Sequence, residues 1–243
     1  MRWIPTASST RARSSDPLVP AVPAYSPAVT VALFVLTGLA AAGDWIAVAR
    51  RTQRLELLLK PLTLLLLLAA AGSAGLGDAK PWVLAALALG LVGDVALLFA
   101  HDSAGARLDP AFLAGLGAFL LGHVAYLVAF ARHGLHGWQA LAGLLVVSGA
   151  SVLALPRVLR GARETGGPQL AAVVALYAAV LAAMTTLSWG TGAVLTAIGG
   201  LFFLASDITL AWDRFVQPLL RGPVIVIVTY HVAQVLIVLG LIR

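Results

Sequence analysis

The chain of 243 residues contains no cysteine. Without thiols it forms no disulfide bond, holds no metal ion through thiolate ligands and offers no cysteine nucleophile. Two histidine spacings typical of zinc sites on helices, H-E-x-x-H and H-x-x-x-H, are also missing from the sequence. We therefore expect no metal site, although Asp and His side chains do occur inside apolar segments.

Charged residues are scarce as well. They make up 11% of the chain, whereas soluble domains carry roughly 25% because their surfaces face water. Hydrophobic residues make up 60% of the chain, and the mean hydropathy is +0.97. The apolar residues form long runs instead of alternating with polar ones, which indicates helices in lipid and argues against a β-barrel.

Eight apolar runs follow one another, each close to the roughly 20 residues that cross a bilayer as a helix. They cover residues 28–49, 56–76, 81–100, 110–131, 138–156, 168–189, 191–212 and 223–242. Beyond the amino-terminal region, the prolines lie near the expected ends of these runs. The sequence predicts an all-α polytopic bundle of eight transmembrane helices over residues 27–243. A disordered tail rich in Pro, Ser and Arg is expected over residues 1–26.

The net charge of +6 does not indicate a nucleic-acid partner, because the basic residues lie between apolar runs. Basic residues at such places set topology. The first, third, fifth and seventh loops hold most of them, so the positive-inside rule puts these loops in the cytoplasm and both termini outside. Abundant Arg and Ala are typical of bacterial proteins from GC-rich genomes, and we expect the bacterial inner membrane.

The two halves of the chain share a short pattern. GDVAL at residues 93–97 resembles SDITL at 206–210, and the next apolar run after each contains HVAY at 123–126 or HVAQ at 231–234. An offset of four helices preserves orientation, so the pattern predicts a parallel four-helix repeat about an axis normal to the membrane.

Ionisable side chains inside a bilayer are costly, and each needs a partner or a function. The candidates are Asp44, Lys60, Asp94, His123, Asp207 and His231. For Asp44, Lys60 and His123, a structural role and a functional role are both open. For Asp94 and Asp207 a functional site is favoured, because two carboxylates at one membrane depth cannot both ionise cheaply and thus supply an acid and a base.

Aromatic and polar side chains accompany these groups. Phe119, His123, Tyr126 and Phe130 follow a 4-3-4 spacing and share one helix face, which suits a lipid chain next to a polar group. In the last apolar run, Tyr230 and Gln234 share a face, with His231 beside them.

Together these segments resemble the YhhN-like family of membrane proteins, whose characterised members are lysoplasmalogenases. The resemblance rests on KPLT at 60–63, LVGD at 91–94, GAFL at 117–120 with His123 and Tyr126, GLFF at 200–203 with Ser206 and Asp207, and YHVAQ at 230–234. It implies cleavage of the vinyl ether bond of a lysophospholipid that enters from the bilayer. The products would be a fatty aldehyde and a glycerophospho-alcohol, and no cofactor would be required.

Vinyl ether hydrolysis needs a protonated carboxylic acid, a negative group near the developing cation and a path for water. We expect Asp94 to be the general acid, with Asp207 and His123 as further catalytic residues. Lys60 is expected to bind the phosphate, and the other expected substrate-binding residues are Phe119, Tyr126, Phe203, Tyr230, His231 and Gln234. Two alternatives remain open at this point, a lipid or small-molecule carrier that uses the same charges and a membrane scaffold. The sequence leaves the oligomeric state undetermined.

Overall fold

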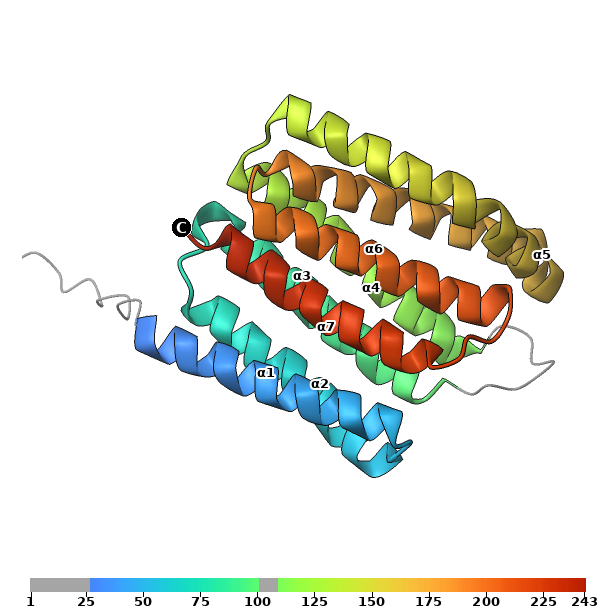
Figure 1. Cartoon of the computed structure of the whole chain (residues 1–243), viewed down its shortest axis with the longest axis horizontal. Coiled ribbons are helices and arrows are strands. Elements are labelled where there is room, and N and C mark those ends of the chain that lie inside the picture. The colour runs from blue at the N-terminus through green and yellow to red at the C-terminus, as the bar shows by residue number, and fades with distance from the viewer. Residues whose placement is uncertain (1–26, 101–108) are drawn as a thin grey trace, which may run out of the picture.

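A computed structural model describes residues 27–100 and 109–243. Its helices are α1 (Pro27–Ala49), α2 (Gln53–Ser73), a 3-10 turn η1 (Gly77–Ala79), α3 (Lys80–Leu98), α4 (Pro110–His133), α5 (Gly137–Gly190), α6 (Val194–Phe215) and α7 (Gly222–Leu241), shown in Figure 1. Within the described residues, seven helices are long and apolar enough to cross a membrane. The predicted all-α fold is confirmed, and these spans indicate an integral membrane protein.

The predicted number of eight helices is not confirmed, because the fifth and sixth predicted spans both fall within α5. The fifth span was expected to end at Pro156, but the helix continues through this proline. The basic segment 157–163, expected to be a loop, is therefore helical. The structure does not show the predicted four-helix repeat, and the predicted tail over residues 1–26 lies outside the described residues.

Helix α5 is bent back on itself at two glycines. Gly166 and Gly167 have non-helical backbone angles, and the φ of +74° at Gly167 lies in the left-handed region that glycine adopts without strain. The His136 N–H, just before α5, donates to the Gly190 carbonyl at 2.7 Å. A straight helix of 54 residues would separate these ends by about 80 Å. Helix α5 therefore consists of two antiparallel arms, which Figure 1 shows side by side.

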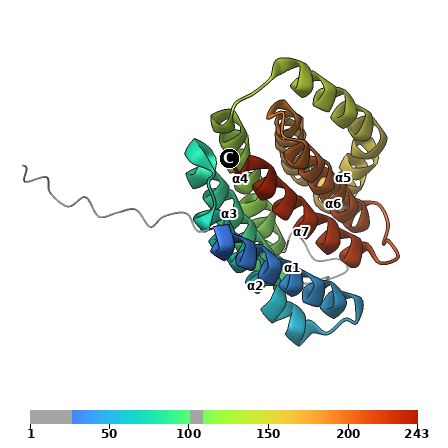
Figure 2. The same cartoon turned by 60° about the vertical axis from the view of Figure 1, so that its left-hand side comes forward.

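The helices form a ring. Each of α1 to α6 packs against the next helix along the chain, and α7 packs against α1. Figure 2 shows α7 lying between the α1–α2 pair and the α5–α6 pair. Large apolar side chains cover the outside, with Val152 at 74% and Leu153 at 70% exposure. Such an outer surface suits contact with lipid, so polar side chains are collected in the interior.

The two ends of the bundle differ in charge. At one end, which we call the terminal end, Thr30 hydrogen-bonds Ser73, and the Arg243 N–H donates to the Gly75 carbonyl at 2.9 Å. At the opposite, basic end lie the carboxyl ends of α1, α3 and α6 and the bend of α5 (Figure 1). The described basic residues at these ends, at the bend and in the turns beside them are Arg50, Arg51, Arg54, Arg157, Arg160, Arg163, Arg214 and Arg221.

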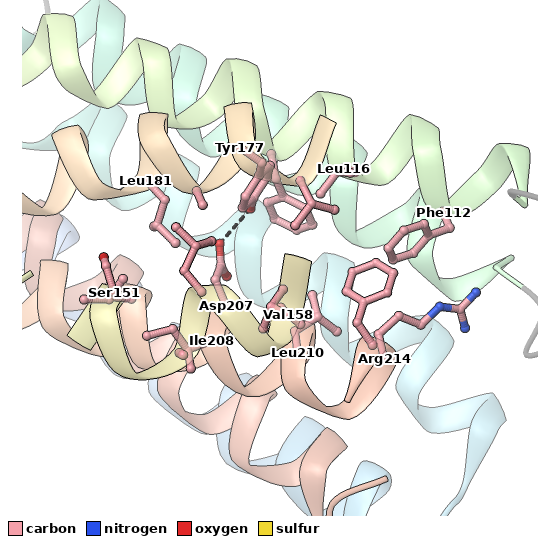
Figure 3. Close-up of a pocket in the computed structure, with 18 of the residues that line it drawn as sticks. Phe112, Leu116, Ser151, Val158, Tyr177, Leu181, Asp207, Ile208, Leu210 and Arg214 are labelled. Carbon is pink, nitrogen blue, oxygen red and sulfur yellow. Dashed lines mark hydrogen bonds between the residues drawn. The ribbon is translucent and has the colours of Figure 1, made fainter. Parts of the chain in front are cut away.

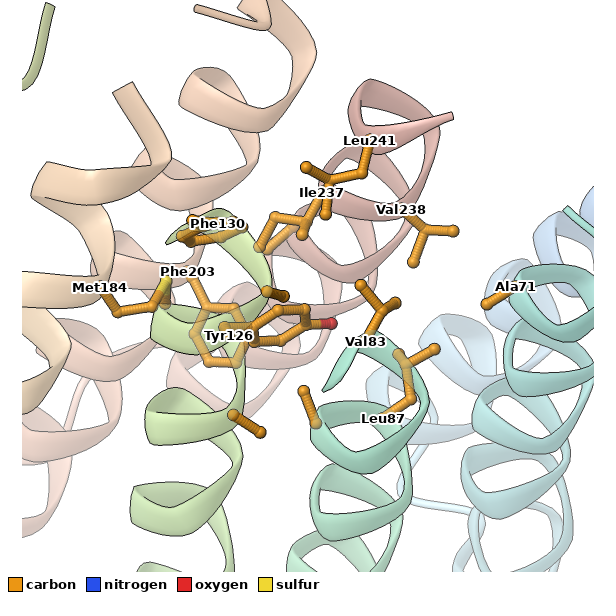
Figure 4. Close-up of a cluster of buried hydrophobic side chains, with 14 of the residues drawn as sticks. Ala71, Val83, Leu87, Tyr126, Phe130, Met184, Phe203, Ile237, Val238 and Leu241 are labelled. Atoms are coloured by element: carbon orange, nitrogen blue, oxygen red, sulfur yellow. The ribbon is translucent and has the colours of Figure 1, made fainter. Parts of the chain in front are cut away.

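The half of the bundle toward the terminal end is filled by a continuous apolar core. Tyr126, Phe130, Leu87, Ile237 and Leu241 are fully buried in it, as Figure 4 shows. They come from α3, α4 and α7, and Met184 of α5 and Phe203 of α6 add to the same cluster. The space left inside the ring therefore lies in the other half.

Candidate functional site

A cavity of about 330 Å³ occupies the half of the bundle toward the basic end. We call it the polar cavity, and residues from all seven helices line it. Its polar and charged lining residues are Glu56, Lys60, Asp94, Tyr177, Ser206, Asp207, Asp213, Arg214 and Tyr230. It extends to Ala100 and Pro223, next to the end of α3 and the start of α7 at the basic end.

Asp94 and Asp207, predicted as catalytic residues from two separate segments, both line the polar cavity. Asp94 lies on α3 and is 3% exposed. It interacts electrostatically with Lys60 and lies beside the Tyr230 hydroxyl, yet its Oδ2 has no partner of good hydrogen-bond geometry among the described residues. One buried Asp94 oxygen thus lacks a well-oriented donor in the part of the chain that the structure describes.

Gly93 allows the close packing next to Asp94. A Cβ atom at this position would lie 2.6 Å from the Phe119 ring, which is closer than real Cβ atoms approach. Phe119 of α4 therefore packs directly on the α3 backbone, and its ring also meets that of Tyr230 at 5.7 Å. Phe119, predicted to bind substrate, lines the polar cavity.

Asp207 on α6 is held by a residue that sequence reasoning missed. The Tyr177 hydroxyl, on the second arm of α5, donates to Asp207 Oδ2 at 2.7 Å. His123 Nε2 lies 3.8 Å from the same oxygen, and its ring packs edge-on against those of Tyr177 and Phe203. The only signal for Tyr177 in the sequence was a single tyrosine in the middle of an apolar run.

Among the described residues, two cations line the polar cavity. Lys60 pairs with Glu56 at 3.2 Å across one helical turn and also interacts electrostatically with Asp94. Arg214, in the last turn of α6, lies with its guanidinium 4.9 Å from the Phe112 ring centre. Sequence reasoning assigned Arg214 to a topology-setting loop, because its place at a helix end gives no sign that it borders a cavity. Lys60 and Arg214 together suit an anionic group such as phosphate.

The other residues predicted to bind substrate are buried and do not line the polar cavity. The Tyr126 hydroxyl donates to Gln234 Oε1, and the Trp45 indole N–H donates to His231 Nδ1 at 3.2 Å. Tyr126, Gln234, His231 and Phe203 border neither the polar cavity nor the second pocket described below. His123 also lines neither of the two spaces. The roles of these five residues stay predictions, and only Lys60, Phe119 and Tyr230 of the predicted binding set line the polar cavity.

Asp44 on α1 lies apart from this arrangement. It is fully buried, borders neither cavity, and neither of its carboxylate oxygens has a hydrogen-bond partner among the described residues. Its electrostatic neighbours are Lys60, Glu56 and Asp94. The structure therefore gives Asp44 charged neighbours, Asp94 among them, but no place in the lining of either cavity.

A second, apolar pocket of about 90 Å³ adjoins the polar cavity between α4, both arms of α5 and α6. Figure 3 shows Tyr177 and Asp207 at its wall, joined by their hydrogen bond, with Leu181 and Ile208 on one side and Phe112 on the other. We call it the apolar pocket. Leu97, Phe112, Phe119, Tyr177, Asp207, Leu210 and Arg214 line both spaces. The combined site thus offers carboxylates and cations next to an apolar chamber, which suits acid–base chemistry on an amphiphile.

Comparison with known proteins gives a consistent picture. Residues 55–241 match the YhhN family. The chain is similar to lysoplasmalogenase TMEM86B of Homo sapiens, with 33% identity over 159 residues that cover 65% of this chain and 62% of the human protein. It is also similar to lysoplasmalogenase TMEM86B of Sus scrofa (36% over 155 residues, 64% and 61%) and of Mus musculus (32% over 170 residues, 69% and 66%). The matched segments thus span about six tenths to two thirds of these relatives. No solved structure matches the chain.

Proposed function

The chain belongs to the YhhN family, and from this premise we propose that it is a membrane hydrolase that cleaves the vinyl ether bond of a lysophospholipid. The products are a fatty aldehyde and a glycerophospho-alcohol. One observation carries the proposal: Asp94 and Asp207, from different helices, line one cavity that also contains Lys60 and adjoins an apolar pocket. Similarity to lysoplasmalogenases supports the choice of bond.

The proposed reaction begins with proton transfer from the Asp94 carboxylic acid to the vinyl carbon that is not bonded to oxygen. A carboxyl group enclosed in low dielectric favours its neutral form, so it is available as an acid. The transfer produces an oxocarbenium ion, and the carboxylate of Asp207 stabilises this positive charge. Two carboxyl groups that flank a substrate perform comparable work in glycoside hydrolysis.

Water from the basic end then adds to the oxocarbenium carbon, and the proton that it releases restores the acid form of Asp94. The resulting hemiacetal collapses to the aldehyde and the alcohol, so the overall reaction consumes one water molecule. Tyr177 holds Asp207 through its hydrogen bond. His123, which borders neither cavity, acts in this proposal only through Asp207, 3.8 Å away.

The charged lining orients the lipid. Lys60 and Arg214 bind the phosphate toward the basic end, which leaves the glycerol and the vinyl ether beside the two carboxylates. Phe119 and Tyr230 supply aromatic wall next to Asp94. The substrate therefore needs both a phosphate and an apolar chain to fill the site.

Both arms of α5 are proposed to cross the membrane, which gives eight crossings and brings both ends of the described chain to one side. The basic end then lies in the cytoplasm and the termini lie outside, as in a bacterial inner membrane. A phosphatase or fluorescent reporter fused after Arg243 tests this topology. Phosphatase activity of the fusion is expected, and a fluorescent cytoplasmic reporter contradicts the topology.

The decisive experiment is turnover of a lysoplasmalogen by the purified protein in detergent. Release of fatty aldehyde is expected, with none from the matched lipid that has a saturated ether in place of the vinyl ether. A folded protein that releases no aldehyde would falsify the hydrolase. Uptake of the intact lipid into vesicles without aldehyde release would instead favour the carrier, although the filled core toward the terminal end supports the hydrolase.

A further inference from the structure

We infer that the apolar pocket between α4, α5 and α6 binds the hydrocarbon chain of the lipid substrate and thereby sets which chain lengths the protein accepts. The inference rests on the proposed function for the identity of the lipid. The binding of a hydrocarbon chain in this pocket does not depend on the proposed function, because a lipid can bind there without being cleaved.

Three helix faces are directed into this pocket with regular spacing. The first arm of α5 contributes residues 151, 154, 155 and 158, and the second arm contributes 174, 177, 178 and 181. Both sets follow the i, i+3, i+4, i+7 pattern of a single helix face. Helix α6 continues the pattern with 204, 207, 208, 211 and 215. The pocket is therefore a slot between continuous faces, and not a chance gap at one packing defect.

The faces that line the slot are as long as a lipid chain. Lining residues on α6 run from Leu204 to Phe215, which at the rise of a helix corresponds to about 16 Å. The hydrocarbon of one leaflet is about 15 Å deep, half of a bilayer core. Ala154, Ala178 and Ala211 line the slot where bulkier side chains would fill it.

Continuity with the polar cavity identifies the occupant as the chain of an amphiphile. Seven residues line both spaces, and Asp207 and Tyr177 stand where they meet. Asp207 lies only one turn from the Leu204 end of the slot, so a lipid with its phosphate near Lys60 and Arg214 turns at Asp207 and places its chain in the slot toward Phe215. A purely apolar lipid would leave the charges of the polar cavity without a counterpart.

The first test measures binding of lysophospholipids with a saturated ether, which cannot be cleaved at a vinyl ether, to the purified full chain. Short, intermediate and long chains are compared in wild type, Ala154→Phe and Ala178→Phe. Each substitution places a ring in the slot from a different arm of α5. We expect each to weaken binding of the long-chain lipid at least about tenfold more than binding of the short-chain lipid. Equal losses at all chain lengths, or no loss, would overturn the inference.

Leu153→Phe is the matched control, because Leu153 precedes Ala154 but is 70% exposed on the outer surface. It adds the same ring without entering the slot and should leave the chain-length dependence unchanged. If Ala154→Phe or Ala178→Phe fails to fold, a second measurement on the wild-type protein replaces it. A lysophospholipid with a photoreactive group near the end of its chain should label slot residues such as Val174. Labelling confined to outward residues such as Leu153 contradicts the inference.

These measurements separate the slot from the chemistry. Chain-length-dependent binding of the uncleavable lipid without aldehyde release from a lysoplasmalogen supports the slot and refutes the hydrolase. Aldehyde release with no effect of the two phenylalanine substitutions supports the hydrolase and refutes the slot.

Discussion

The two halves of the bundle differ in how their interior is filled. Toward the terminal end, Tyr126, Phe130 and Ile237 meet in a filled core, and the polar atoms of Tyr126 and Gln234 satisfy each other. Toward the basic end, the same helices enclose a cavity lined by Asp94, Asp207 and both cations. One half is thus packed for stability, whereas the other keeps charged groups accessible to water. Substitutions in the two halves should therefore affect different properties.

The largest effect is expected for Asp94→Asn, which removes the proposed acid from the hollow half. Turnover should fall at least about a hundredfold, the usual scale for a general acid, while the thermal stability of the protein is retained. Aldehyde release from a lysoplasmalogen, measured together with thermal unfolding in detergent, checks both properties. Near-normal turnover would remove Asp94 from the role of acid.

Asp207→Asn is the matched variant for the same experiment. A strong loss in both variants is expected if one carboxyl group donates the proton and the other stabilises the cation. If Asp207→Asn retains normal turnover, the reaction uses a single acid at Asp94.

Ile237→Ala probes the packed half and should have the reverse effect. Its side chain is fully buried, and its removal leaves a cavity that costs about 2 kcal/mol, the lower end of the range for such core substitutions. Turnover by the folded protein should stay near that of wild type. Unfolding by heat or denaturing detergent measures the loss. An Ile237→Ala protein with normal stability but impaired turnover would contradict the division between the two halves.

A smaller effect is expected for Tyr177→Phe, which keeps the ring but removes the hydroxyl that donates to Asp207. Loss of a hydrogen bond to a charged group costs about 1.5 kcal/mol, so turnover should fall about tenfold. A positioning role predicts that kcat falls and that the pH profile of turnover changes, with KM nearly constant. Unchanged kcat and pH profile would show that Tyr177 acts only in packing.

The smallest effect on turnover is expected for Asp44→Asn. Asp44 is as deeply buried as Asp94 but borders neither cavity, so turnover should stay within about twofold of wild type. Since a buried carboxylate without hydrogen bonds is costly, stability should be equal or higher in the neutral variant. A loss of activity comparable to that of Asp94→Asn would show that burial alone, without cavity access, marks the functional carboxylates.

Much of the candidate site was predictable because ionisable groups are conspicuous in apolar runs. Asp94, Asp207 and Lys60 were selected for this reason, and all three line the polar cavity. Tyr177 and Arg214 were not selected. A tyrosine in an apolar run is ordinary, and an arginine at a helix end fits the rule for topology. Their importance comes from which helices are neighbours, and local periodicity carries no information about that.

The bend in α5 shows the same limit in the fold. The sequence separated two apolar runs and left residues 157–167 between them, which includes the actual corner at Gly166 and Gly167, but it ended the first helix at Pro156, ten residues too early. Proline in a helix costs one hydrogen bond, which the surrounding turns tolerate in the first arm. The corner instead needs a residue that adopts a positive φ, and Gly167 supplies it.

The sequence by itself determined that this chain is an all-α membrane protein with a few buried charges, because apolar run length and the cost of charge in lipid are local properties. Only the tertiary structure decided that Asp94 and Asp207 share a cavity while Asp44 is sealed away. It also decided that the two arms of α5 enclose a slot beside Asp207. Contacts between helices depend on how the seven helices are arranged in the ring, and the sequence of a single helix does not determine that arrangement.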